Sequence, residues 1–259
     1  MQCDVDPDVI REITDTRPVQ LAVPGSSGFP VLENLARDPS FSGLVICELL
    51  PGLVSNVART SDPRRQERYV RCYESRSADA LLEARLRSEV QQRALFLQAQ
   101  LGIWSVAKHL LNRKLPDPLT RMTLPNRSVR LSFNGELSTR KPLPITRSEI
   151  DSVTVKATTS RCREYANAIR KRGGIVVFVR FPSSGSERIE ENAAYPRTEE
   201  WDLFARNVNT PCLHFEDDLQ LVQFVCPDES HLDARDVERF TRILHDSIVA
   251  QITRFRVSK

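Results

Sequence analysis

The chain has 259 residues, 40% of them hydrophobic, which is enough to bury a large core in a single α/β domain. Its 37 Lys and Arg residues against 34 Asp and Glu residues give a formal net charge of +3. This near balance argues against a dedicated nucleic-acid binder, so no nucleic-acid partner is expected. No apolar run reaches the roughly 18 residues that suggest a transmembrane helix, and we expect a soluble chain.

The N-terminal segment, MQCDVDPDVIREITD, is acidic and lacks the basic and apolar regions of a signal peptide. Cytoplasmic localisation is therefore the default expectation, with an N-terminal membrane anchor in a longer parent chain as the alternative. The six cysteines form no CxxC pair and have no histidine at zinc-finger spacing. We expect most of them to be free thiols.

Short apolar segments and helical patterns alternate along the chain. Segments with the composition of β-strands are residues 19–23, 44–50, 128–133, 175–181 and 212–216. Helical patterns occupy residues 29–39, 148–174 and 233–252, with Asp233 as the expected N-cap of the last helix. The alternation predicts one α/β domain over residues 1–259, a three-layer sandwich with a five-stranded, mostly parallel, flavodoxin-like sheet.

Residues 59–115 do not fit this alternation. Apolar residues at helical spacing from Val90 to Leu111 predict a long amphipathic helix, inserted into the sheet unit. The region 108–147 contains nine basic residues against two acidic ones. Solvated helix faces and loops explain most such runs of charge, and the alternative is association with an anionic membrane or polysaccharide.

The segment LAVPGSSGFPVLENLA, residues 21–36, leads from the first predicted strand into the first predicted helix. The turn between them contains Ser26 and Ser27. A serine hydroxyl is a poor nucleophile until a base takes its proton. Ser27 is therefore a candidate nucleophile only if the fold brings a histidine to it.

One of the four histidines is suited to that role. His231 follows Asp228 by three residues, in a loop just ahead of the last helix. A turn there can direct the carboxylate onto the imidazole, as in the triads of acyl-transfer enzymes. The alternative is that Asp228 only shapes the loop and His231 is a surface residue. The other histidines, His109, His214 and His245, are predicted to be structural.

Two blocks, Gly25-Ser26-Ser27 after the first strand and DESHLD at residues 228–233, resemble the SGNH/GDSL hydrolase superfamily. The resemblance covers about residues 19–254, apart from the insertion. It implies that Ser27 is the nucleophile and that Asp228 and His231 form the DxxH pair. Ser26 stands where the family often has aspartate. That replacement is similar to a divergent GSS branch, resembling alginate O-acetyltransferases and D-alanine transfer proteins.

The reaction also needs donors for the oxyanion of the transition state. The backbone N–H groups of Ser27 and Gly28 open the first helix, where the dipole favours an anion. The resemblance adds Gly52, in LLPGL after the second strand, and Asn134 after the third. Ordinary Pro-Gly and Asn-Gly turns are the alternatives for these two positions.

Three residues later in the chain are candidates for contact with a substrate. Arg180, near the end of the fourth strand, is suited to bind a carboxylate, phosphate or sugar oxygen, with a surface salt bridge as the alternative. Tyr195 and Trp201 either form an apolar wall for a substrate or anchor a loop on the core.

Together these features predict a serine-dependent acyl-ester hydrolase or O-acyl(acetyl)transferase that works through an acyl-enzyme, with no metal and no cofactor. Its expected substrate is a small acyl ester or an acylated saccharide. Water and a sugar hydroxyl attack the same acyl-enzyme, so hydrolysis and transfer both stay open. The alternative is a catalytically degenerate SGNH fold that binds a carbohydrate, an anionic surface or a protein partner.

Overall fold

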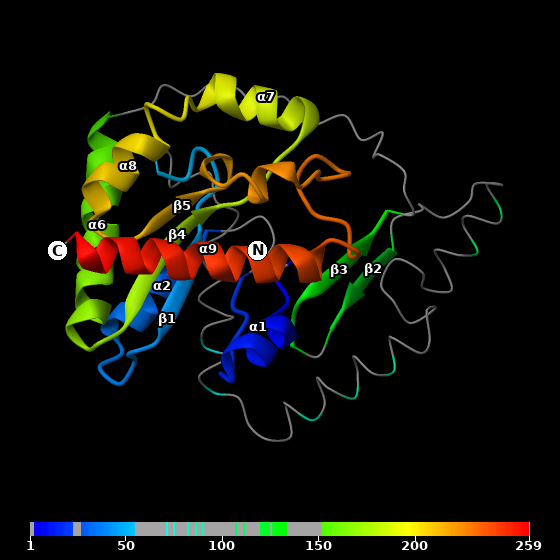
Figure 1. Cartoon of the computed structure of the whole chain (residues 1–259), viewed down its shortest axis with the longest axis horizontal. Helices are drawn as coiled ribbons and strands as arrows, with labels where there is room; N and C mark the ends of the chain where they lie inside the picture. Colours follow the sequence, from blue (N-terminus) through cyan, green and yellow to red (C-terminus); the bar gives the residue numbers. More distant parts are fainter. Residues whose placement is uncertain are drawn as a thin grey trace.

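The computed structural model describes residues 3–22, 27–54, 120–124, 126–133 and 152–258, together with isolated positions between 71 and 111. In these residues the main sheet consists of β1 (Leu44–Glu48), β4 (Ile175–Arg180) and β5 (Cys212–His214). The strand order is β1-β4-β5, and both pairings are parallel (Figure 1). The α/β class is confirmed, whereas a five-stranded flavodoxin-like sheet is not present in the described part.

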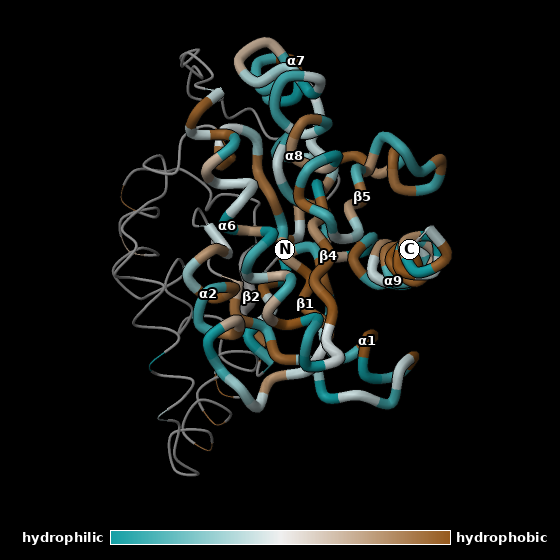
Figure 2. The backbone as a smooth tube through the Cα atoms, turned by 90° about the vertical axis from the view of Figure 1, so that its left-hand side faces the viewer, coloured by the Kyte–Doolittle hydropathy of each residue, from teal (hydrophilic) through white to brown (hydrophobic). Residues whose placement is uncertain are grey.

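Helices cover both faces of this sheet. On one face lie α2 (Phe29–Arg37), α6 (Ser152–Lys171) and α8 (Trp201–Val208). The other face carries α1 (Pro7–Thr14) and α9 (Val237–Val257). Figure 2 shows the hydrophobic strands β1 and β4 between α2 and α6 on one side and α9 on the other. The crossover from β4 to β5 contains α7 (Gly185–Ala194) and α8.

Strand β4 is the centre of the core because it is buried on both faces. Val176 and Phe178 pack in the cluster with α2, α6 and α8, while Val177 and Val179 pack in the cluster with α9. This alternation follows from the two-residue period of a strand, and a nearly continuous apolar run is typical of a strand in a parallel sheet. The last residue of the strand is Arg180, which lies at the carboxyl edge of the sheet, where ligands usually bind in parallel sheets.

Two of the five predicted strands are not in this sheet. Residues 19–22 are irregular and Val19 is half exposed, so the described part of the first predicted strand does not form. Strand β4 is paired with β1 on one side and with β5 on the other, so the first predicted strand has no position beside β4. Residues 128–133 contain β3 (Val129–Ser132), which instead forms an antiparallel pair with β2 (Thr120–Thr123). A local turn favours that pair, since the Leu124 N–H donates to the Ser128 carbonyl at 2.8 Å.

The helix boundaries follow local signals, with one correction. Helix α2 has Pro30 in its first turn and ends where the Asp38 N–H donates to the Asn34 carbonyl. The residue at the N-cap position of α9 is Asp236, without a side-chain capping bond, rather than Asp233. The Asp233 carboxylate instead accepts from the Phe133 N–H at 3.0 Å, accepts from the Arg235 N–H in the turn before the helix, and pairs with the Arg235 side chain.

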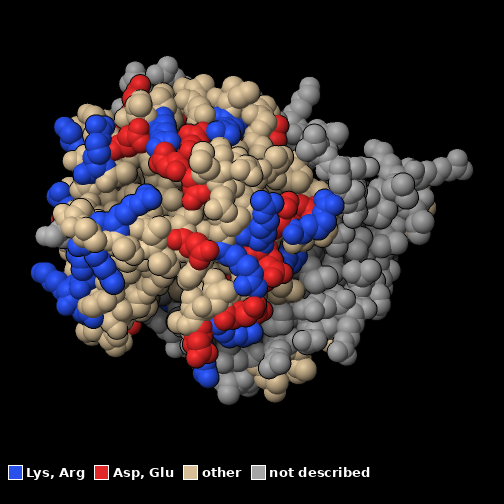
Figure 3. Space-filling view, in the orientation of Figure 1, with Lys and Arg blue, Asp and Glu red and all other residues tan. Residues whose placement is uncertain are grey.

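Other predictions fall wholly or largely outside the described residues. These are the insertion at 59–115, most of the basic region 108–147, and Gly25, Ser26 and Asn134. Four cysteines of the described part, Cys47, Cys162, Cys212 and Cys226, are free thiols, in agreement with the prediction. Within the described residues, no helix has the length and apolar character needed to cross a membrane. Acidic and basic side chains are interspersed over the face that carries α9 (Figure 3).

Replacing Phe240 of α9 by alanine is expected to lower the free energy of unfolding by about 3–5 kcal/mol. The side chain is fully buried, and its ring packs edge-on against Phe181 and Phe224 at centroid distances of 5.4 and 5.1 Å. Urea unfolding followed by circular dichroism measures the loss. The control is Val249→Ala, at an exposed position of the same helix, with an expected change within about 0.5 kcal/mol. Equal stability of the two variants would contradict this packing.

Candidate active site

The candidate active site lies at the edge of the sheet where the parallel strands end. Its candidate general base, His231, lies in residues 226–234, which we call the dyad loop. The His231 Nδ1 lies 2.9 Å from the Asp228 Oδ2. The other carboxylate oxygen, Oδ1, accepts from the backbone N–H groups of Ser230 and His231 at 3.1 and 2.7 Å. The turn therefore directs the aspartate onto the imidazole, as the spacing of the two residues predicts.

This contact perturbs both members of the pair. Burial lowers the pKa of His231, but its hydrogen bond to Asp228 and the negative charges of Asp4 and Asp228 outweigh this effect, so the pKa lies above its ordinary value. For Asp228, burial raises the pKa, but the hydrogen bonds donated by His231 and by the backbone outweigh this effect. The pKa of Asp228 therefore lies below its ordinary value. An ionised Asp228 accepts from the Nδ1–H, which leaves the Nε2 of His231 as the basic nitrogen.

Three other segments hold the dyad loop. The Leu232 N–H donates to the Asp4 carboxylate at 2.9 Å, which ties the loop to the N-terminal segment. The Ala234 N–H donates to the Leu131 carbonyl at 2.7 Å, which ties it to β3. The strand that was predicted to join the sheet thus contacts the dyad loop instead. Third, the Ser184 N–H, just before α7, donates to the Glu229 carbonyl at 2.9 Å.

Glu229 connects the dyad loop to the start of α7 by its side chain as well. Its carboxylate accepts from the N–H groups of Ser186 and Glu187, each at 3.0 Å, and from the Ser186 hydroxyl at 2.8 Å. A carboxylate at this position satisfies free donors of the first helical turn and complements the helix dipole. The position of Asp228 is therefore coupled to the position of α7.

Replacing Gly185 by alanine is expected to disturb this connection. Gly185 has a φ of +57°, and a Cβ there would overlap the Glu229 carboxylate. The control is Gly173→Ala, because Gly173 has a φ of +90° but nothing within 4 Å of its Cβ position. Both variants incur the strain of a left-handed residue, about 1–2 kcal/mol. We expect urea unfolding to show a larger loss for Gly185→Ala, and equal losses would contradict the steric argument.

Ser27 lies at the same edge, immediately before α2. Its Oγ accepts a hydrogen bond from the Phe29 N–H at 3.1 Å, and its side chain is buried. A Cβ on Gly28 would lie 3.0 Å from the Cys47 Sγ, so the start of α2 is close to the carboxyl end of β1. In the described part of the chain, Ser27 and His231 are not hydrogen-bonded to each other.

The candidate oxyanion donors differ in their availability. The N–H groups of Ser27 and Gly28 donate to no other described residue. The Gly52 N–H, in contrast, donates to the Glu200 carboxylate at 2.8 Å, and Gly52 has a φ of +82° in a turn closed by the Leu53 N–H and the Leu50 carbonyl. Asn134 lies outside the described residues.

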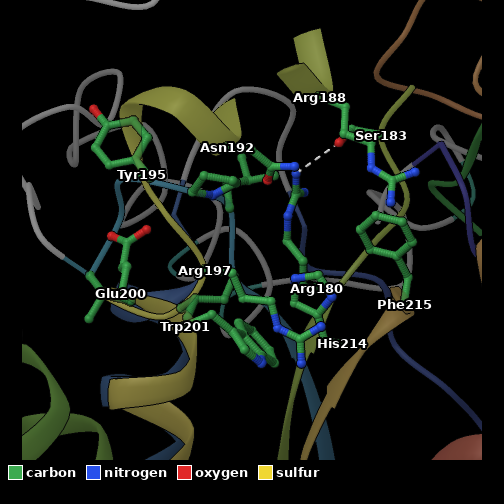
Figure 4. A pocket seen from close by; sticks show the side chains of 14 residues that line it. Arg180, Ser183, Arg188, Asn192, Tyr195, Arg197, Glu200, Trp201, His214 and Phe215 are labelled. Carbon is green, nitrogen blue, oxygen red and sulfur yellow. Dashed lines mark hydrogen bonds between the residues drawn. The ribbon is translucent and has the colours of Figure 1, made fainter. Parts of the chain in front are cut away.

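Arg180 is buried and lines a pocket beside this site, rather than forming the alternative, a surface salt bridge. Its Nη2 lies 2.5 Å from a Glu191 carboxylate oxygen and 3.2 Å from the Ser183 hydroxyl. The pocket is small and partly open to solvent. Figure 4 shows side chains from several elements converging on it. It is lined by Leu49, Leu50, Pro51, Val54, Arg180, Ser183, Arg188, Asn192, Tyr195, Arg197, Glu200, Trp201, His214 and Phe215.

Sequence reasoning selected Arg180, Tyr195 and Trp201 from this lining and missed, among others, His214, Arg188 and Arg197. His214 was predicted to be structural, and Arg188 and Arg197 were not considered. Burial and then the charges of the nearby arginines lower the pKa of His214 to about 3, so the imidazole stays neutral. The signal in the sequence that could have indicated the two arginines was their occurrence together in the crossover segment that follows the buried strand β4. Trp201 is largely buried and packs edge-on against His214, so it is both a core anchor and part of the pocket wall.

Comparisons of the chain with protein-family models, with curated proteins and with solved structures find no match. The function therefore has to be inferred from the residues and their geometry. Two local arrangements are relevant: a hydrogen-bonded Asp228–His231 pair, and a serine just before a helix with two backbone N–H groups that donate to no other described residue.

Proposed function

We propose that the protein is a serine-dependent acyl-ester hydrolase or O-acyltransferase. Ser27 is the nucleophile, His231 the general base and acid, and Asp228 the group that orients His231. The observation that carries the proposal is the 2.9 Å contact between the His231 Nδ1 and the Asp228 Oδ2. A carboxylate in this position holds the imidazole in one tautomer and stabilises the imidazolium that forms during acyl transfer.

In the proposed reaction, the Nε2 of His231 takes the hydroxyl proton of Ser27 as the Oγ attacks the acyl carbonyl carbon. The tetrahedral intermediate collapses when its bond to the alcohol oxygen breaks, and His231 gives the proton to the leaving alcohol. Water or a sugar hydroxyl then gives its proton to His231 and attacks the acyl-enzyme. Collapse of the second intermediate releases the acid or the new ester, and the proton returns to Ser27.

The start of α2 supports the oxyanion in this proposal. The N–H groups of Ser27 and Gly28 are unoccupied by other described residues, and they lie at the positive end of the helix dipole. Loss of a single oxyanion donor typically costs about 2.7–4 kcal/mol of transition-state stabilisation. These two donors are therefore sufficient to make a large contribution to the rate.

A second candidate is a non-catalytic binding scaffold with this fold. It is favoured by the Gly52 N–H, which is engaged by the Glu200 carboxylate instead of being free for an oxyanion. Ser27 and His231 also have separate local partners. An activated serine distinguishes the two candidates, because a scaffold does not need one.

The test is intact-mass spectrometry of the full chain after exposure to a fluorophosphonate probe, with the adduct mapped by peptide sequencing. We expect one adduct, on Ser27, and a much slower reaction in His231→Ala, because the base that activates the hydroxyl is gone. Ser184 and Ser186 are the informative controls, since both are hydrogen-bonded to the dyad loop. An adduct on either one would overturn the assignment of Ser27, and no adduct on the folded protein would favour the scaffold.

A further inference from the structure

The pocket that contains Arg180 has hydrogen-bond donors that the protein itself does not use. Arg180 is 6% exposed and donates only from its Nη2, so its Nε and Nη1 have no partner among the described residues. Arg188 pairs with Glu216 through its Nη2 alone, and its guanidinium lies 5.0 Å from the centroid of the Phe215 ring. Figure 4 shows both arginines among the side chains that line this pocket.

His214 adds a third donor. Its Nδ1 accepts from the Glu216 N–H at 3.2 Å, so the proton of the neutral ring is on the Nε2. The residue is only 7% exposed, yet no described residue accepts a hydrogen bond from this Nε2–H. His214 lines the pocket, so this donor is available to a ligand acceptor there.

Three of the side chains that line the pocket are arginines, Arg180, Arg188 and Arg197, and Glu200 is the one carboxylate among the lining residues. Each of these arginines is paired with a carboxylate outside the lining, Glu191 or Glu216. The pocket therefore offers the remaining N–H donors of the arginines rather than a net positive charge. Arginine is well suited to such a site because its planar guanidinium presents several donors to a carboxylate or phosphate.

We propose that this pocket binds an anionic group, a carboxylate or a phosphate, carried by the substrate of the proposed acyl-transfer site. The donors would be the free N–H groups of Arg180 and Arg188 and the Nε2–H of His214. The role of the pocket in substrate selection rests on the proposed function, whereas anion binding itself does not. Arg180 is four residues from Ser184, whose N–H donates to the Glu229 carbonyl, so the pocket wall is connected to the dyad loop.

The test is isothermal titration calorimetry of the full chain with inorganic phosphate and with glucuronate, and glucose is the uncharged control. The variants are Arg188→Gln, which removes a half-buried cation, and His214→Asn, whose amide oxygen can still accept the Glu216 N–H. We expect each variant to bind the anion about tenfold more weakly, the loss typical of one hydrogen bond to a charged group. The matched control is Arg242→Gln, since Arg242 is likewise ion-paired, with Glu12 and Glu238, but lies on α9, outside the pocket. Circular dichroism verifies that each variant is folded.

The outcomes separate the two ligand chemistries and the two proposals. Binding of glucuronate alone assigns a carboxylate, and binding of phosphate alone assigns a phosphate. Glucose binding as tight as glucuronate binding, or no binding of either anion to the folded wild type, overturns the proposal. So does an equal loss of affinity in Arg242→Gln. Fluorophosphonate labelling of Ser27 is scored separately, so a labelled protein without anion binding disproves the anion site alone.

Discussion

Ser27→Ala is expected to lower the turnover of an activated ester such as p-nitrophenyl acetate at least about 10³-fold, because removal of a catalytic serine leaves only binding and oxyanion stabilisation. The loss of stability should be small. The Ser27 Oγ accepts one hydrogen bond, from the Phe29 N–H, and a local hydrogen bond of this kind contributes about 1 kcal/mol. Steady-state rates and urea unfolding of the same preparation separate the two effects.

The matched control for this prediction is Ser40→Ala. The Ser40 hydroxyl also makes a local hydrogen bond beside α2, to the Asp38 carboxylate at 2.6 Å, but it lies past the other end of the helix. We expect this variant to retain the wild-type rate. Turnover that persists in Ser27→Ala would show that another group is the nucleophile.

Asp228→Asn is expected to reduce turnover about 10⁴-fold, the loss seen when the aspartate of a triad becomes an amide that no longer holds the right tautomer. The matched control is Asp246→Asn. Asp246 also contacts a histidine, with its carboxylate 3.0 Å from the His245 Nδ1, but that pair lies exposed on α9. A similar loss in both variants would mean that Asp228 has no special relation to the reaction.

The pH dependence gives a second measure of the same contact. His231 acts as a base only when it is neutral, so kcat/KM falls as the pH decreases through its pKa. In the wild type, Asp228 and Asp4 raise this pKa above its ordinary value in spite of burial. In Asp228→Asn one carboxylate is gone and burial persists, so the acidic limb should move to lower pH. If the acidic limb of kcat/KM lies at the same pH in both proteins, a group other than His231 produces it.

The accuracy of the sequence-based predictions depended on how local each feature was. The turn that joins Asp228 to His231 spans three residues, and its hydrogen bonds form within the segment itself. The start of α2 was likewise predictable from Pro30 and the turn before it. In contrast, the apolar pattern of residues 128–133 indicated a strand but not its partner. That strand pairs with β2, because a tight turn brings the two together.

The amino-acid sequence by itself determined the three parallel strands, the α/β class, the position of Ser27 ahead of a helix and the contact between Asp228 and His231. Only the tertiary structure decided that the Gly52 N–H pairs with Glu200, far along the chain, and that arginines from β4 and its crossover share a pocket with His214. The physical reason is the distance along the chain between the residues that interact. Helix starts and short turns satisfy their hydrogen bonds among neighbouring residues, so their residue types specify them. Partners across the fold are chosen by competition among many packing arrangements, which the pattern of one segment does not encode.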